Sequence, residues 1–166
     1  MKNNFLVLIV TCFLLTACGG SGGHAVEAYP VNPVPSIVSF DITDSYGVDT
    51  ATSTWALEVD PYIDNGLFDL RWRVNSLEDY EVNIRVNSRA DTYNSILIYS
   101  DVCGAGLSCD QRGNLICEYT ADYYLSCGRG LASSIKSLPQ DLYVILEICD
   151  LDSLYCTIAK YPVSML

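Results

Sequence analysis

Apolar and polar residues alternate along much of the chain after Ser36, and this period of two constrains the fold more than any other feature. In the segments 38–42, 55–59, 68–74 and 80–86 every second residue is apolar. Successive side chains of a strand point to opposite faces, so the pattern predicts half-buried strands. The sequence therefore predicts an all-β fold.

Other segments extend this prediction. Leucine and isoleucine residues between 131 and 138 have helical spacing, so a short helix is expected there, ending before Pro139. Turn-forming residues separate the strands at short intervals, which is typical of an antiparallel β-sandwich with an immunoglobulin-like or fibronectin-like architecture. No cysteine precedes Trp72 in the folded part, so the likeness is one of architecture only. Further strands are predicted at 95–100, 115–119, 123–127, 142–149 and 154–161.

The segments 68–74 and 80–86 are joined by a short polar loop and are expected to form a hairpin. In the expected register Val74 faces Tyr80 across the loop. The same count places Asp69 opposite Arg85 on the outer face, where the two would form a cross-strand ion pair.

The chain has eight cysteines. Cys12 and Cys18 lie in the N-terminal region, which leaves an even number of six for the folded part. Metal-binding spacing of the Cys-x2-Cys type and histidine partners are both absent from this set, which favours disulfides. Spacing alone leaves 15 connectivities open, and we expect the local one. The expected pairs are Cys103–Cys109, Cys117–Cys127 and Cys149–Cys156.

The N-terminus carries Lys2 followed by an apolar run from Phe5 to Leu15. A membrane-spanning helix needs about 20 apolar residues, so this run is too short to span and fits a secretory signal. Its end, Leu15-Thr16-Ala17-Cys18, resembles the lipobox of bacterial lipoproteins.

The resemblance implies that residues 1–17 are a signal peptide and that Cys18 becomes the acylated first residue. Acyl chains on Cys18 would anchor the protein stably in a lipid bilayer. Gly19 follows the cysteine where inner-membrane members of that family tend to have aspartate, which favours the outer membrane. We therefore expect a lipid-anchored protein of the cell outer membrane, facing the periplasm or the cell surface.

Glycine and proline dominate the next segment, so residues 18–35 are expected to form the lipidated cysteine and its tether. Residues 36–166 are then about 130 in number, enough for a single β-sandwich domain. The chain has 9 basic and 20 acidic side chains. Removal of Lys2 with the signal leaves 8 minus 20, or −12. This charge repels phosphate backbones, so nucleic acid is not expected as a partner.

Candidate sites for chemistry are few. The single histidine, His24, lies in the tether, so imidazole-based catalysis is not expected in the domain. Asp60, Asp64 and Asp69 offer oxygen ligands near a turn and form a weak candidate calcium site, with ordinary turn chemistry as the alternative. No other cofactor is expected. We expect no enzymatic activity. A hydrolase that works with two carboxyl groups is the one enzymatic alternative.

The segment 103–130 combines four cysteines, five glycines and three tyrosines. Crosslinked loops that carry tyrosines favour recognition, because little entropy is lost on binding. The alternative is that the disulfides and tyrosines only stabilise the loops. We expect a membrane-anchored module that binds a protein or a glycan; a structural or accessory subunit of a periplasmic envelope or secretion complex is the alternative. The candidate binding residues are Arg112, Tyr123, Tyr124 and Arg129.

Overall fold

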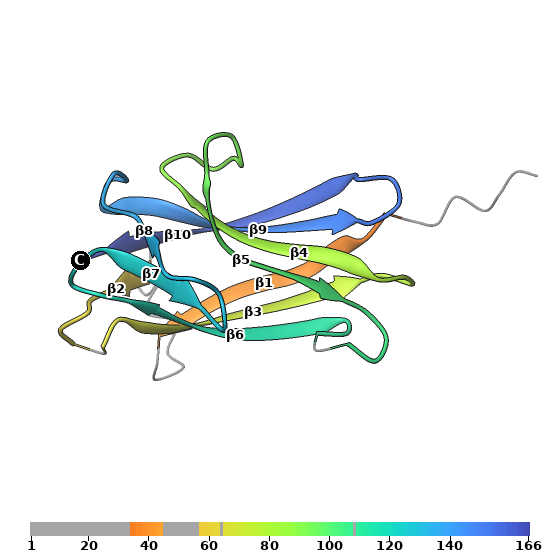
Figure 1. Cartoon of the computed structure of the whole chain (residues 1–166), viewed down its shortest axis with the longest axis horizontal. Coiled ribbons are helices and arrows are strands. Elements are labelled where there is room, and N and C mark those ends of the chain that lie inside the picture. The colour runs from red at the N-terminus through yellow and green to blue at the C-terminus, as the bar shows by residue number, and fades with distance from the viewer. Residues whose placement is uncertain (1–33, 45–56, 64, 108) are drawn as a thin grey trace, which may run out of the picture. The chain divides into compact units, whose positions relative to one another are not determined.

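The computed structural model describes residues 34–44, 57–63, 65–107 and 109–166 and shows an all-β domain (Figure 1). The described strands form two five-stranded sheets, which pack on a shared core as a sandwich. Every strand pair is antiparallel except that of β2 with β10. The features predicted at residues 1–17, Cys18, His24, Trp55 and Asp64 lie outside the described residues.

The two sheets are named here A and B. Sheet A has the order β1-β3-β6-β7-β8, with β1 (Ser36–Asp44), β3 (Leu67–Asn75), β6 (Arg112–Tyr119), β7 (Tyr124–Cys127) and β8 (Ser133–Ser134). Sheet B has the order β2-β10-β9-β4-β5, with β2 (Leu57–Val59), β10 (Cys156–Met165), β9 (Asp141–Asp150), β4 (Tyr80–Asn87) and β5 (Ile96–Cys103).

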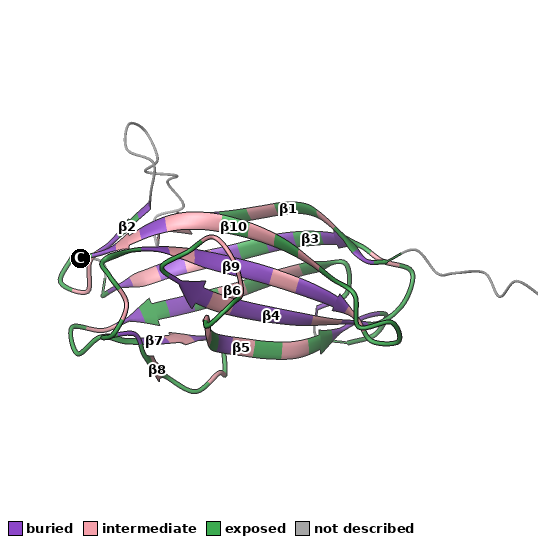
Figure 2. Cartoon of the chain, turned by 90° about the horizontal axis from the view of Figure 1, so that it is seen from above, coloured by how far each residue is buried: buried purple, intermediate pink, exposed green. Residues whose placement is uncertain are grey.

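The alternation of apolar residues on β3 and β4 is confirmed as the origin of the core. Burial of these side chains between the sheets is the main favourable term in folding. Figure 2 shows little exposed surface on β4 and β9, since each has a strand on both sides in sheet B. The buried residues on the two predicted segments are Phe68, Leu70, Trp72, Val74, Tyr80, Val82, Ile84 and Val86.

The predicted hairpin that placed Val74 opposite Tyr80 is wrong. β3 pairs with β1 and β6 in sheet A, whereas β4 pairs with β5 and β9 in sheet B. A period of two is satisfied equally by a hairpin and by strands of two facing sheets, so the pattern could not separate them. Arg85 therefore forms its ion pair with Glu147, at 2.7 Å, and not with Asp69.

A β-bulge at Val38 also departs from simple alternation. Ile37 lies opposite Val74, and Ser39 lies opposite Arg73. One residue, Val38, thus has no partner on β3, and it is 54% exposed. The expectation that Val38 points into the core is wrong, because the extra residue lets Ile37 pack there instead.

The helix predicted between 131 and 138 is wrong, and the described residues contain no helix. The chain forms β8 there, which pairs with β7. Ile135 is buried and its N–H donates to the Tyr123 carbonyl at 2.9 Å. Leu131 is 88% exposed. Pairing with a neighbouring strand has overridden the local helical spacing.

The three expected disulfides are all present: Cys103–Cys109, Cys117–Cys127 and Cys149–Cys156. The second joins β6 to β7 at a register pair, and the third joins β9 to β10 in the same way. Each closes a short loop, with sequence separations of 6, 10 and 7 residues. Local pairing was therefore the correct choice among the possible connectivities.

The strand order does not confirm the immunoglobulin-like part of the prediction. In the immunoglobulin sheet ABED, strand E lies beside strand B and comes later in the chain than strand D, its outer neighbour. Here β6, which lies beside β3, precedes its outer neighbour β7. The sandwich is confirmed, and the immunoglobulin-like name stays a prediction.

Candidate functional site

The two sheets meet along two lateral seams that differ in packing. At the first, called the closed seam, β1 of sheet A lies against β10 of sheet B. Phe40 of β1 and Tyr161 of β10 pack on the core, and Thr157 Oγ1 donates to the Pro35 carbonyl at 3.3 Å. At the second, called the open seam, β5 of sheet B faces β6 and β7 of sheet A (Figure 1).

The open seam has a gap because β7 is short. This four-residue strand reaches only Cys117–Tyr119 on its β6 side. Gly128 N–H then donates to the Ile116 carbonyl at 2.9 Å, and the chain turns away from β6. Among the described residues no strand continues along the outer edge of β6 from Arg112 to Leu115.

A cavity of about 600 Å³ lies in this gap. We call it the seam cleft. Its size is within the range of small-molecule sites, about 300–1,000 Å³. It combines two aromatic rings with charged, amide and hydroxyl side chains. Its lining residues are Trp72, Tyr99, Ser100, Asp101, Cys109, Asn114, Leu115, Gly128, Arg129 and Gly130.

Trp72 forms part of the inner wall of the seam cleft. It lies opposite Gly113 in the register of β3 and β6, and a Cβ on Gly113 would come within 1.9 Å of its Cζ2 atom. The indole therefore occupies the space that any larger residue at 113 would need. Burial raises the pKa of the neighbouring Tyr80 hydroxyl, although the Trp72 N–H beside it acts in the opposite direction. Tyr80 donates to the Asp110 carbonyl at 2.5 Å.

Tyr99 and Asp101 form a fixed polar pair on the β5 side. The Tyr99 hydroxyl donates to Asp101 Oδ2 at 2.8 Å, and Asp101 Oδ1 accepts the Val102 N–H at 2.8 Å. Burial of the ring, followed by the hydrogen bond and the charge of Asp101, raises the pKa of Tyr99 to about 12. The phenol is thus neutral at physiological pH and holds one carboxylate oxygen in place.

Arg129 projects from a turn whose backbone is held in place both before and after this residue. Gly128 has a φ of +55°, a conformation that glycine adopts at low cost, and it directly follows the disulfide-bonded Cys127. Gly130 N–H donates to the Cys127 carbonyl at 2.9 Å. The turn carries a long cationic side chain to the rim of the cleft on a backbone that is already ordered.

The structure separates the four predicted binding residues. Arg129 lines the seam cleft, and Arg112 is exposed at the start of β6. Tyr123 lines a different cavity of about 270 Å³ next to Tyr119, and Tyr124 is exposed at the start of β7. The predicted segment therefore contributes Arg129 to the seam cleft, and its other three candidate residues lie elsewhere.

Sequence reasoning missed the other side of the cleft. The alternating pattern assigned Trp72 to the core. This assignment is correct but incomplete, because Trp72 also lines the cleft. Tyr99 comes from a strand that the pattern placed without neighbours, and Asn114 lies just before the strand predicted at 115–119, because β6 begins earlier than expected. The available signals are a hydroxyl and an amide in or next to predicted strands, and both are too common to single out a site.

The weak calcium candidates do not form a cluster in the described residues. Asp60 Oδ1 accepts the Tyr62 N–H at 2.8 Å in a turn, and Asp69 pairs with Arg71 at 3.1 Å. This is the ordinary turn and surface chemistry named as the alternative. Calcium binding there stays an untested prediction.

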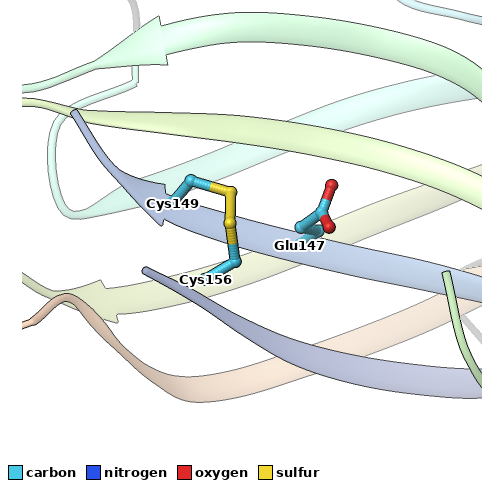
Figure 3. A group of neighbouring side chains, drawn as sticks. All are labelled: Glu147, Cys149 and Cys156. Carbon is cyan, nitrogen blue, oxygen red and sulfur yellow. A yellow bond between two sulfur atoms is a disulfide. The ribbon is translucent and has the colours of Figure 1, made fainter. Parts of the chain in front are cut away.

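One group of possible metal ligands occurs in the described part of the chain. It consists of Glu147, Cys149 and Cys156, whose ligand atoms lie within 4.8 Å of one another. Figure 3 shows that the two sulfur atoms are bonded to each other, so they are not thiolates. The Glu147 carboxylate already accepts a hydrogen bond from Arg85. These contacts account for the cluster without a metal.

The described part of the chain also holds no helix with the length and hydropathy of a membrane span. Comparison of the chain with models of protein families, with curated proteins and with solved structures found no match.

Proposed function

We propose that this protein is a membrane-anchored recognition module that binds a glycan in the seam cleft. The observation that carries the proposal is the combination of aromatic rings and polar side chains in a cavity of about 600 Å³. The half-buried Tyr99 ring offers apolar area, Trp72 is 3% exposed and closes the inner wall, and the hydroxyl, amide, carboxylate and guanidinium groups offer donors and acceptors for sugar hydroxyls.

Rigidity of the cleft supports this proposal. Cys109 lines the cleft and is bonded to Cys103, while Cys127 ends β7 immediately before the Gly128–Gly130 turn. A site that is ordered before binding loses less conformational entropy when the ligand enters. Disulfides near the cleft thus favour binding as well as stability.

The lipobox resemblance supplies the anchoring part of the proposal. Acylated Cys18 would hold the protein at the outer membrane, and the tether up to Pro35 would let the domain reach away from it. A Cys18→Ala variant should leave the membrane fraction for the soluble fraction. Protease treatment of intact and of permeabilised cells should then show whether the domain faces outward or into the periplasm.

A glycan array probed with the full-length protein in detergent tests the function. Tyr99→Ala and Asn114→Ala should weaken binding at least about tenfold, as expected for loss of a hydrogen bond or an aromatic contact at a central position. Ile116→Ala is the matched control, since Ile116 is 61% exposed on the same strand as Asn114 and does not line the cleft.

Two outcomes contradict the proposal. Absence of glycan binding by the wild-type protein would remove it. Capture of a protein partner that depends on Tyr123 and Tyr124 and is insensitive to the cleft variants would favour the accessory role in an envelope complex.

A further inference from the structure

The arginines of this acidic protein are distributed unevenly. The chain has six, and the structure describes all of them. Three form ion pairs with carboxylates: Arg71 with Asp69, Arg85 with Glu147, and Arg89 with Asp91. The other three, Arg73, Arg112 and Arg129, have no carboxylate partner among the described residues.

Arg73 and Arg112 lie directly opposite each other on the outer face of sheet A. Both are exposed. The third residue in this cross-strand row is Ser39 of β1, so the row contains no acid. Like charges in facing positions destabilise a sheet. Two facing guanidinium groups in a protein with a large acidic excess therefore indicate a demand other than stability.

This row continues toward the seam cleft. Arg112 and Asn114 are both on the outer face of β6, two residues apart, which is about 7 Å along a strand. Asn114 lines the cleft, and Arg129 lines it from the Gly128–Gly130 turn. The unpaired arginines thus extend from the cleft along one end of sheet A.

We infer that the glycan bound in the seam cleft is anionic, with its acidic groups paired to Arg129 and Arg112. This inference rests on the proposed function and specifies the ligand of the same site. Guanidinium groups bind carboxylates, sulfates and phosphates through paired N–H donors, which gives both strength and orientation. The net charge of the protein repels long polyanions, so the arginines select a short or sparsely charged glycan at close range.

Acidic groups on a sugar include the carboxylate of a uronic acid and the phosphate of a glycolipid headgroup, and these are the two sources compared. The test measures binding of three probes to the full-length protein. They are an oligogalacturonate, the same oligomer as its neutral methyl ester, and a phosphorylated glucosamine disaccharide. The preferred anionic probe identifies the source.

We expect at least one anionic probe to bind at least about tenfold more tightly than the neutral ester, with affinity falling as salt is added. Arg129→Gln and Arg112→Gln should each remove most of this preference. Arg89→Gln is the control, because it removes the same charge from an exposed arginine that already pairs with Asp91. An equal loss in Arg89→Gln would overturn the inference by showing a general charge effect.

The neutral ester separates failure of this inference from failure of the proposed function. If it binds as tightly as both anionic probes and its binding still depends on Tyr99 and Asn114, the cleft binds glycans but the ligand is not anionic. If the wild-type protein binds none of the glycans, both proposals fall.

Discussion

The closed and open seams are both formed by strands with alternating apolar residues. The first is packed, and the second contains a cleft. At the closed seam β1 and β10 lie in contact, and the half-buried Phe40 and Tyr161 pack on the core. At the open seam β7 ends after four residues, and a cleft remains between β5 and β6. The length of one strand, more than its composition, decides whether the sandwich edge is packed or available to a ligand.

Removal of the disulfide that holds β7 to β6 should have the largest effect on the open seam. Cys117→Ala/Cys127→Ala should lower the free energy of unfolding by about 2–5 kcal/mol, the usual cost in a small secreted domain. Binding in the cleft should also be lost, because the Gly128–Gly130 turn follows Cys127 directly. Chemical denaturation and glycan titration measure the two effects.

Cys149→Ala/Cys156→Ala is the control for that variant. This pair joins β9 to β10 away from the cleft and closes a loop of similar length. It should reduce stability comparably and leave glycan affinity unchanged at temperatures where the protein is folded. Equal loss of binding in both double variants would contradict the local role of Cys117–Cys127.

Truncation of one side chain at each seam should affect stability at both seams and binding at only one. Phe40→Ala at the closed seam should cost about 2 kcal/mol, less than for a fully buried ring because Phe40 is half-buried. Leu115→Ala at the open seam should cost about 1–2 kcal/mol and also weaken glycan binding, since Leu115 lines the cleft. Weaker binding in Phe40→Ala with no change in Leu115→Ala would reverse the assignment of the two seams.

Much of the fold could be predicted because local patterns determine it. Alternation identified the buried faces of β3 and β4, and short spacing identified all three disulfides. The sheet to which β4 belongs could not be predicted, because Val82 and Ile84 are equally well buried from either side of the core. The bulge at Val38 likewise depends on the pairing of β1 with β3. The sequence of β1 alone does not determine this pairing.

The candidate site was predictable only in part for the same reason. Arg129 stood out between two glycines in a cysteine-rich segment. Tyr99 joins the site because β5 forms the edge of sheet B opposite a short β7, which is a property of strands far apart in the chain. Non-local pairing thus supplied the half of the cleft that local reasoning missed.

Gly113→Ala tests the packing that shapes the inner wall of the open seam. The added Cβ would clash with Trp72, so the indole must move, at a cost of about 1–3 kcal/mol. Tryptophan fluorescence in a Trp55→Phe background should report the displacement of Trp72, and glycan affinity should fall. Unchanged emission and affinity would show that the ring position is not set by Gly113.

The alkaline titration of Tyr99 should change the stability of the protein only at high pH. Its pKa is raised from about 10 in the unfolded chain to about 12. The associated stability is fully present below pH 10 and is lost as the pH rises through about 12. NMR of labelled tyrosines, assigned with Tyr99→Phe, should show a late transition that Asp101→Asn shifts to lower pH. An unshifted transition in Asp101→Asn would contradict the role of that carboxylate.

The most direct test of the open seam as the binding site is the amide NMR spectrum of the full-length protein with and without its glycan. Binding at the open seam should shift the signals of the Trp72 indole, the Asn114 side-chain amide and the Gly128–Gly130 backbone. Signals of Ile37 and Ala159 at the closed seam should stay in place. Shifts confined to the closed seam or to Tyr123 and Tyr124, with the cleft signals unmoved at saturation, would contradict it.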